Sequence, residues 1–210
     1  MFLLFHIVRD MEGVNMLKNY MDVEHEALIR YVDRNSMDVN GIQRVMRIFS
    51  NVRNSVEYDN TTVIIQRASE TLVMRRGNNA SKNVLLCAVL KLNGFNCDVR
   101  YRYISDNTKG IAFRVEKIVP WFYVHVNYMG KEIELDCSLD KSFMCAVRVW
   151  HKGRDNDYSM KDYYRADGQA FEILSEEKSI DDVNNMDKFF NNVKDNFLNA
   201  YSSKCNPSYI

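Results

Sequence analysis

Cysteine and histidine are the residues of this chain whose chemistry suits a nucleophile, a general base or a metal ligand. The 210 residues contain five cysteines and four histidines, and no cysteine belongs to a CxxC pair. This odd number predicts neither a disulfide framework nor a zinc ribbon. The spacing of the most plausible metal-binding set, which is Cys137, Cys145, His125 and His151, matches no common zinc site. We therefore expect no metal, no cofactor, and a reducing, cytoplasmic location.

Three segments have the apolar spacing of helices. Over residues 37–58 the apolar side chains recur every three or four positions, which is typical of an amphipathic helix. Residues 79–93 are apolar on nearly every side, so this helix should lie at the centre of the fold and stop at Gly94. Residues 179–201, beginning with Ser179, predict a last amphipathic helix.

Alternating β-branched and aromatic residues predict strands between these helices. The expected strands are residues 97–103, 112–118, 121–128 and 132–136, and Met129 and Gly130 form the turn before the last one. The predicted fold class is α+β, with the central helix packed on an antiparallel β-sheet and extra helices at both ends of the chain. No linker divides the sequence, so we expect a single domain over residues 1–210, with a core at about 37–140 and an extension at 141–210.

Charge and hydropathy argue against two classes of partner. Acidic and basic residues each number 28, the net charge is zero, and no long run of one sign would favour nucleic acid. The apolar opening segment ends at Arg9 after eight residues, which is too short to span a bilayer. We expect no nucleic-acid partner and no membrane partner, and the sequence does not indicate an oligomeric state.

Three ordered blocks resemble the transglutaminase-like family, whose fold is related to that of papain. They are FSNVRNSVEYD at 49–59, ASETLVMRRGNNASKNVLLCAVLKLNGFNCDVRYR at 68–102 and WFYVHVNYMGKEIELDCSLD at 121–140. The second block is similar to the core helix of the family, with matches at Gly77, Lys82 and Gly94, and the third to its strand hairpin, with matches at Gly130 and Lys131. The resemblance covers about residues 20–140 and implies a transglutaminase-like, papain-like fold.

The same resemblance implies that the family's catalytic triad is incomplete. In the family, a cysteine at the start of the core helix attacks the substrate, a histidine accepts its proton and an aspartate orients the histidine. These positions fall on Asn79, Trp121 and Asp136. Asn79 can cap a helix but cannot form a thiolate, and the indole of Trp121 only donates, for example to Asp136. We expect a catalytically degenerate protein that binds a peptide or protein ligand through the former cleft.

Three further residues are candidates for the wall of that cleft: Ser81, Tyr123 and His125. Ser81 has no identified base and suits a helix start, and His125 is expected to be a half-exposed strand residue, too distant to replace Trp121. Two alternatives remain open. One is a thiol hydrolase with a relocated nucleophile, although Cys87 suits the core and Cys137 should point away from the site. The other is a structural scaffold whose cleft is filled.

Overall fold

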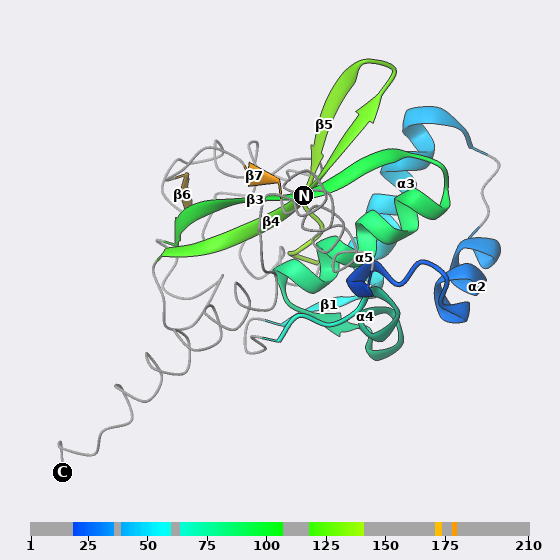
Figure 1. Ribbon diagram of the computed structural model, residues 1–210, viewed down its shortest axis with the longest axis horizontal. Coiled ribbons are helices and arrows are strands. Elements are labelled where there is room, and N and C mark those ends of the chain that lie inside the picture. Colours follow the sequence, from blue (N-terminus) through cyan, green and yellow to red (C-terminus); the bar gives the residue numbers. More distant parts are fainter. Residues whose placement is uncertain are drawn as a thin grey trace, which may run out of the picture.

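The computed structural model describes residues 19–35, 39–59, 64–106, 118–140, 171–173 and 178–179. Its helices are α2 (Glu26–Arg34), α3 (Gly41–Ser55), α4 (Ala68–Met74) and α5 (Asn79–Leu92). Its strands are β1 (Glu57–Tyr58), β2 (Arg76–Gly77), β3 (Asn96–Asp106), β4 (Ile118–Tyr128), β5 (Lys131–Leu135), β6 (Phe171–Ile173) and β7 (Lys178–Ser179). Figure 1 shows how these elements are arranged.

The main sheet is antiparallel and has the strand order β5-β4-β3-β6, with β7 also paired to β3. The long β3–β4 ladder runs from the Asn96↔Asn127 pair to the Ser105↔Ile118 pair. The β4–β5 hairpin turns at Met129 and Gly130, whose φ angles of 52° and 75° suit a tight two-residue turn. This hairpin confirms the prediction. A separate parallel pair joins β1 to β2.

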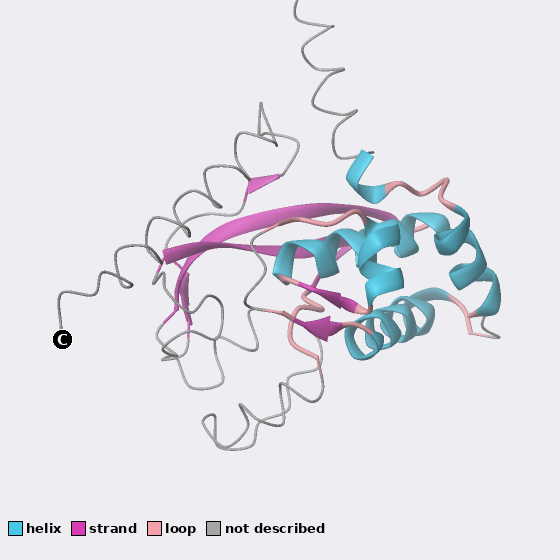
Figure 2. Cartoon of the chain, turned by 90° about the horizontal axis from the view of Figure 1, so that it is seen from below, coloured by secondary structure: helices cyan, strands magenta, loops and turns pink. Residues whose placement is uncertain are grey.

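Helix α5 lies at the centre of the helical layer, and every residue from Asn79 to Leu90 is buried. It contacts β3 and β4 on one side and α3 and α4 on its other sides. The helices gather on one side of the long strands (Figure 2). A central helix on an antiparallel sheet confirms the predicted α+β class. Among the helices in the described ranges, none combines the length and hydrophobicity that crossing a membrane requires.

Several predicted boundaries differ from the structure. The helix expected at 37–58 is shorter in the structure. Helix α3 begins at Gly41, after Asn40, and ends at Ser55. The strand expected at 112–118 lies outside the described residues except for Ile118, which begins β4. Ser179 pairs with Arg100 in the β7–β3 ladder, so the helix start expected at Ser179 is wrong. The rest of that expected helix also lies outside the described residues.

The ammonium group of Lys82 ties α5 to the carboxyl end of α3. Lys82 is 0% exposed, and its Nζ donates to the carbonyl oxygens of Val56 at 2.6 Å and Arg53 at 3.2 Å. Carbonyls at the end of a helix lack partners within the helix and carry partial negative charge, so a cation is stabilising there. Burial lowers the pKa of Lys82 to about 8, and the nearby carboxylates of Asp140 and Asp136 oppose this shift.

The low pKa of Lys82 predicts that stability rises with pH in the alkaline range. Between pH 8 and 10.5 the unfolded chain binds the proton that folded Lys82 has lost. Relative to Lys82→Met, the free energy of unfolding of the wild type should rise there by up to about 1.4 kcal/mol per pH unit. Urea denaturation of both proteins from pH 7 to 10.5 measures the difference, in which the other titrating groups cancel. A difference independent of pH would contradict the lowered pKa of Lys82.

Candidate functional site

The side chain of Asn79, in the first turn of α5, binds the backbone of β4. Its Oδ1 accepts the Phe122 N–H at 2.7 Å, and its Nδ2 donates to the Phe122 carbonyl at 2.8 Å. The β4–β5 ladder ends at Val124 and Leu135, so Phe122 lies on a strand edge that β5 does not reach. The amide of Asn79 therefore supplies hydrogen bonds to the N–H and C=O groups of this strand edge, as the backbone of a neighbouring strand does. A cysteine thiol at this position lacks the adjacent strong donor and acceptor that both bonds need.

The cap of α5 is the residue before Asn79. Asn78 Oδ1 accepts the Ser81 N–H at 2.9 Å, which is the usual bond of a helix N-cap. The expectation that Asn79 can cap this helix is therefore wrong. Because Asn78 caps the helix, the amide of Asn79 is available to the strand.

Trp121 and Asp136 are joined by a hydrogen bond. The indole Nε1 donates to Asp136 Oδ2 at 2.8 Å, as expected for an aspartate that faces the indole. Trp121 is 1% exposed, and its ring lies against Tyr58 with centroids 6.4 Å apart. The indole is a donor only, so Trp121 cannot take a proton from a nucleophile as a histidine would. Its contribution here is a satisfied, buried polar contact.

Asn79, Trp121 and Asp136 belong to one network of buried hydrogen bonds, which Ser138 and Asn83 complete. Neither Ser138 nor Asn83 was predicted from the sequence. Asn79 Nδ2 donates to Ser138 Oγ at 2.6 Å, while the Ser138 hydroxyl and its N–H, at 2.9 Å, donate to Asp136 Oδ1. Asn83 Oδ1 accepts the Cys137 N–H at 3.3 Å, and its Nδ2 lies 3.2 Å from Asp136 Oδ1. The signal was spacing: Asn83 lies one helical turn after Asn79, on the same face.

Two of the expected cleft residues make contacts away from this network. Ser81 is fully buried, and its Oγ accepts the Gln66 N–H at 3.0 Å, so it anchors the segment before α4. Tyr123 is also fully buried, with the guanidinium of Arg102 4.3 Å from its ring centroid. Neither side chain bonds to Asn79 or Asp136 in the contacts of the described residues.

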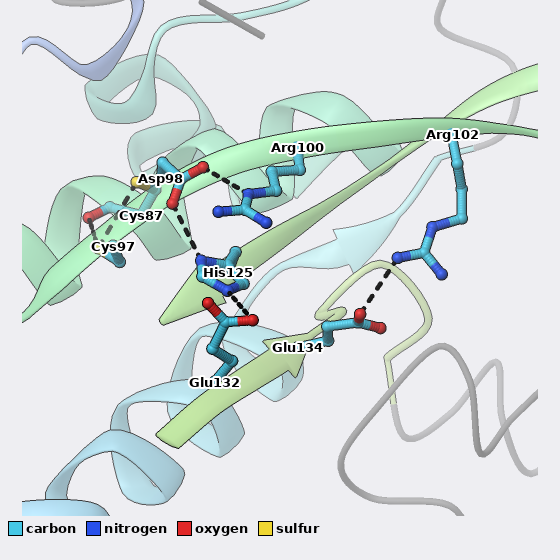
Figure 3. Close-up of polar contacts among 8 residues, drawn as sticks. All are labelled: Cys87, Cys97, Asp98, Arg100, Arg102, His125, Glu132 and Glu134. Atoms are coloured by element: carbon cyan, nitrogen blue, oxygen red, sulfur yellow. Dashed lines mark hydrogen bonds and ion pairs between the residues drawn. The ribbon is translucent and has the colours of Figure 1, made fainter. Parts of the chain in front are cut away.

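His125 is buried, so the expectation of a half-exposed histidine is wrong. It is 5% exposed, and its Nδ1 lies 3.2 Å from Asp98 Oδ1 while its Nε2 lies 3.5 Å from Glu132 Oε2 (Figure 3). The cause is register: Asp98 is the direct partner of His125 across the β3–β4 ladder, and Glu132 comes from β5. Carboxylates on both neighbouring strands surround the imidazole.

The described cysteines are buried thiols. Burial raises the pKa of Cys137 to about 12, and its Sγ lies 3.2 Å from the Lys82 carbonyl, in packing as expected. Cys87 and Cys97 lie in contact, with their sulfur atoms 3.7 Å apart (Figure 3). That contact and burial raise the pKa of Cys87 well above its usual value. Raised pKa values keep Cys87 and Cys137 protonated and weakly nucleophilic.

No metal centre forms among the residues that the structure describes, because no three His, Cys, Asp or Glu side chains there are arranged around one point. Of the four residues considered as ligands from the sequence, Cys145 and His151 lie outside the described ranges.

Removing the Asn79 amide should destabilise the fold. In Asn79→Ala the buried Phe122 N–H loses its side-chain partner, while the Phe122 C=O keeps Asn83 Nδ2 at 2.9 Å. We therefore expect a loss of about 1–3 kcal/mol in the free energy of unfolding. The matched control is Asn54→Ala at an exposed position of α3, where a change near zero is expected. Urea denaturation measures both variants. An Asn79→Ala variant as stable as its control would show that the strand edge does not depend on this amide.

Comparison with known proteins places the fold in a family. The model of the Transglutaminase-like superfamily matches residues 26–132. Among solved structures, a "putative cysteine protease" from Cytophaga hutchinsonii is 15% identical with a TM-score of 0.46, over 76% of this chain and 49% of that chain. A "putative protease" from Parabacteroides distasonis is 14% identical with a TM-score of 0.43, over 59% of this chain and 26% of that chain.

The chain thus spans about half the length of the first structure and about a quarter of the second. None of the curated proteins matches the sequence significantly. The family match covers more than half of the 210 residues and contains both Asn79 and Trp121, with Asp136 just beyond its end. It also contains α5 and the β3–β4 ladder on which that helix packs. The chain belongs to the transglutaminase-like superfamily.

Proposed function

We propose that this chain is a catalytically inactive member of the superfamily that works by binding a protein or peptide partner. The observation that carries the proposal is the pairing of Asn79 with the β4 backbone and of Trp121 with Asp136. An amide and an indole supply neither a nucleophile nor a proton acceptor at neutral pH. Loss of either catalytic group removes nearly all of such a reaction.

The burial of these residues bears on where a partner binds. Asn79 is 3% exposed and Trp121 is 1% exposed, and their polar atoms are engaged within the protein. A ligand contacting them would first have to displace these internal bonds, at a cost comparable to the bonds themselves. We therefore assign the binding role to the outer surface of the fold, with the former triad as part of its framework.

A thiol hydrolase with a relocated nucleophile receives no support from the described cysteines. Cys87 and Cys137 are fully buried with raised pKa values. The hydrogen bond with Cys87 lowers the pKa of Cys97, but Cys97 is only 4% exposed. A relocated nucleophile needs an accessible thiolate within hydrogen-bond reach of a base.

Thiol labelling tests this conclusion. In the native protein at pH 8, iodoacetamide should modify Cys87 and Cys137 at least roughly a hundredfold more slowly than in urea, since a buried protonated thiol reacts only after opening. Peptide mass spectrometry assigns the modified sites, and the urea sample serves as the labelling control. Rapid modification of either residue in the native state would revive the thiol hydrolase.

Restoring the two missing groups tests the inactive triad itself. Wild type should not hydrolyse a fluorogenic peptide library, whereas Asn79→Cys/Trp121→His should gain a slow activity that neither single variant has. Its new thiol stands at the start of α5 and its imidazole next to Asp136, the arrangement that nucleophilic catalysis requires. Circular dichroism checks that the variants are folded. Hydrolysis by wild type that survives in Asn79→Ala and in Trp121→Phe would refute the proposal.

A further inference from the structure

A groove of about 720 Å³ lies between α2, the end of α3 and α4. The elements that form it belong to the helical side of the molecule, away from β6 (Figures 1 and 2). Its charged lining is mostly basic, with Arg30, Arg34 and Arg75 against a single acidic residue, Glu26. Glu26 already forms an ion pair with Arg30 one turn along α2. The groove therefore retains a positive charge that its own carboxylate does not neutralise.

Helix geometry aligns the basic and aromatic residues of one wall. Ala27, Arg30, Tyr31 and Arg34 line the groove at successive three- and four-residue spacings, so they form one stripe along α2. Leu72, Val73 and Arg75 line the facing wall from α4 and its end. Two basic residues, Arg34 and Arg75, thus stand on opposite walls. In the described part of the chain, neither side chain forms an ion pair.

Arg75 occupies a backbone conformation that favours glycine. It ends α4 with a φ of 53°, in the left-handed region. A residue with a Cβ atom has a cost of roughly 1 kcal/mol there, which glycine does not have. The fold itself would be better served by glycine at this position. The long, exposed, cationic side chain of Arg75 therefore points to a role in binding.

Apolar groups accompany the charge. Val73 is 69% exposed, and Tyr31 and Leu72, which also line the groove, are partly buried. Arginine and tyrosine next to apolar side chains are the composition that dominates binding energy at protein–protein interfaces. A polyanion such as nucleic acid would gain little here, because the chain as a whole has no net charge to attract it.

We propose that this groove, lined by Arg30, Arg34 and Arg75, binds an acidic segment of a partner protein that also carries apolar side chains. The inference rests on the proposed binding function and names its surface. A neighbouring groove of the same volume does not fit this partner, because Asp22 and Glu24 there balance Arg67 and Lys91. Charge complementarity thus selects one of the two grooves. Arginine can hold a carboxylate by two parallel hydrogen bonds, which adds geometric selectivity to charge.

A library of random decapeptides displayed on phage provides the probe. Selection on the whole protein at low ionic strength should enrich peptides in which acidic and apolar residues alternate. The same selection on Arg34→Ala/Arg75→Gly should lose this enrichment. For the most enriched peptide, fluorescence anisotropy should give a Kd that rises roughly tenfold for each arginine removed, and that also rises with salt. Arg47→Ala, at an exposed position of α3 outside the groove, is the matched control and should bind as wild type does.

Stability measurements separate lost binding from lost folding. Arg75→Gly should keep or raise the melting temperature, because glycine adopts the positive φ without strain, while its peptide affinity falls. Two results would overturn the proposed binding of an acidic segment in this groove. One is a selection that shows no bias towards acidic peptides, and the other is wild-type affinity in the variants at Arg34 and Arg75. An RNA oligonucleotide that binds with the same arginine dependence, where acidic peptides do not, would overturn it too.

Mass spectrometry of the bound peptide distinguishes this inference from the proposed function. An intact peptide that depends on the arginines supports both. A peptide that is cleaved, yet still depends on the arginines, would contradict catalytic inactivity and leave the groove supported. An intact peptide that is held without the arginines would overturn the groove alone.

Discussion

The burial of α5 on every side is the constraint on which the rest of the structure depends. A helix buried all round carries its polar side chains into the interior, where each one needs a partner. The first turns of α5 contain four such residues, and together they bind four parts of the chain. Asn79 binds β4, Ser81 binds the segment before α4, Lys82 binds the end of α3, and Asn83 binds the segment after β5. The polar end of this helix therefore organises its neighbours.

By the resemblance in sequence, the nucleophile of the family falls at this same end of the helix, and under the proposed function structural contacts stand in its place. In this chain the side-chain amide of Asn79 forms hydrogen bonds with the backbone of Phe122, at a part of β4 that β5 does not reach. Asp136 keeps its place because an acceptor still has donors to bind, namely the indole of Trp121 and the hydroxyl and N–H of Ser138. The carboxylate thus has a structural use that does not depend on catalysis.

Local patterns predicted the elements whose formation depends on near neighbours. The all-round apolar pattern identified α5, and a two-residue turn identified the β4–β5 hairpin. The pairing of β6 and β7 with β3 was not predicted, because strands of two or three residues carry too little pattern. The burial of His125 was also missed. Its environment comes from Asp98 and Glu132 on two other strands, and only register brings them to the imidazole.

The sequence by itself determined the family blocks and the residue types at Asn79, Trp121 and Asp136, because covalent chemistry decides which side chains can attack or accept a proton. It also indicated that the indole could donate to the carboxylate. Only the tertiary structure decided that Asn78 rather than Asn79 caps α5 and that Asn83 and Ser138 close the network. The physical reason is that a buried polar group is satisfied by whichever group the packing brings within hydrogen-bond distance. That choice depends on contacts between residues far apart in the chain, which no local pattern records.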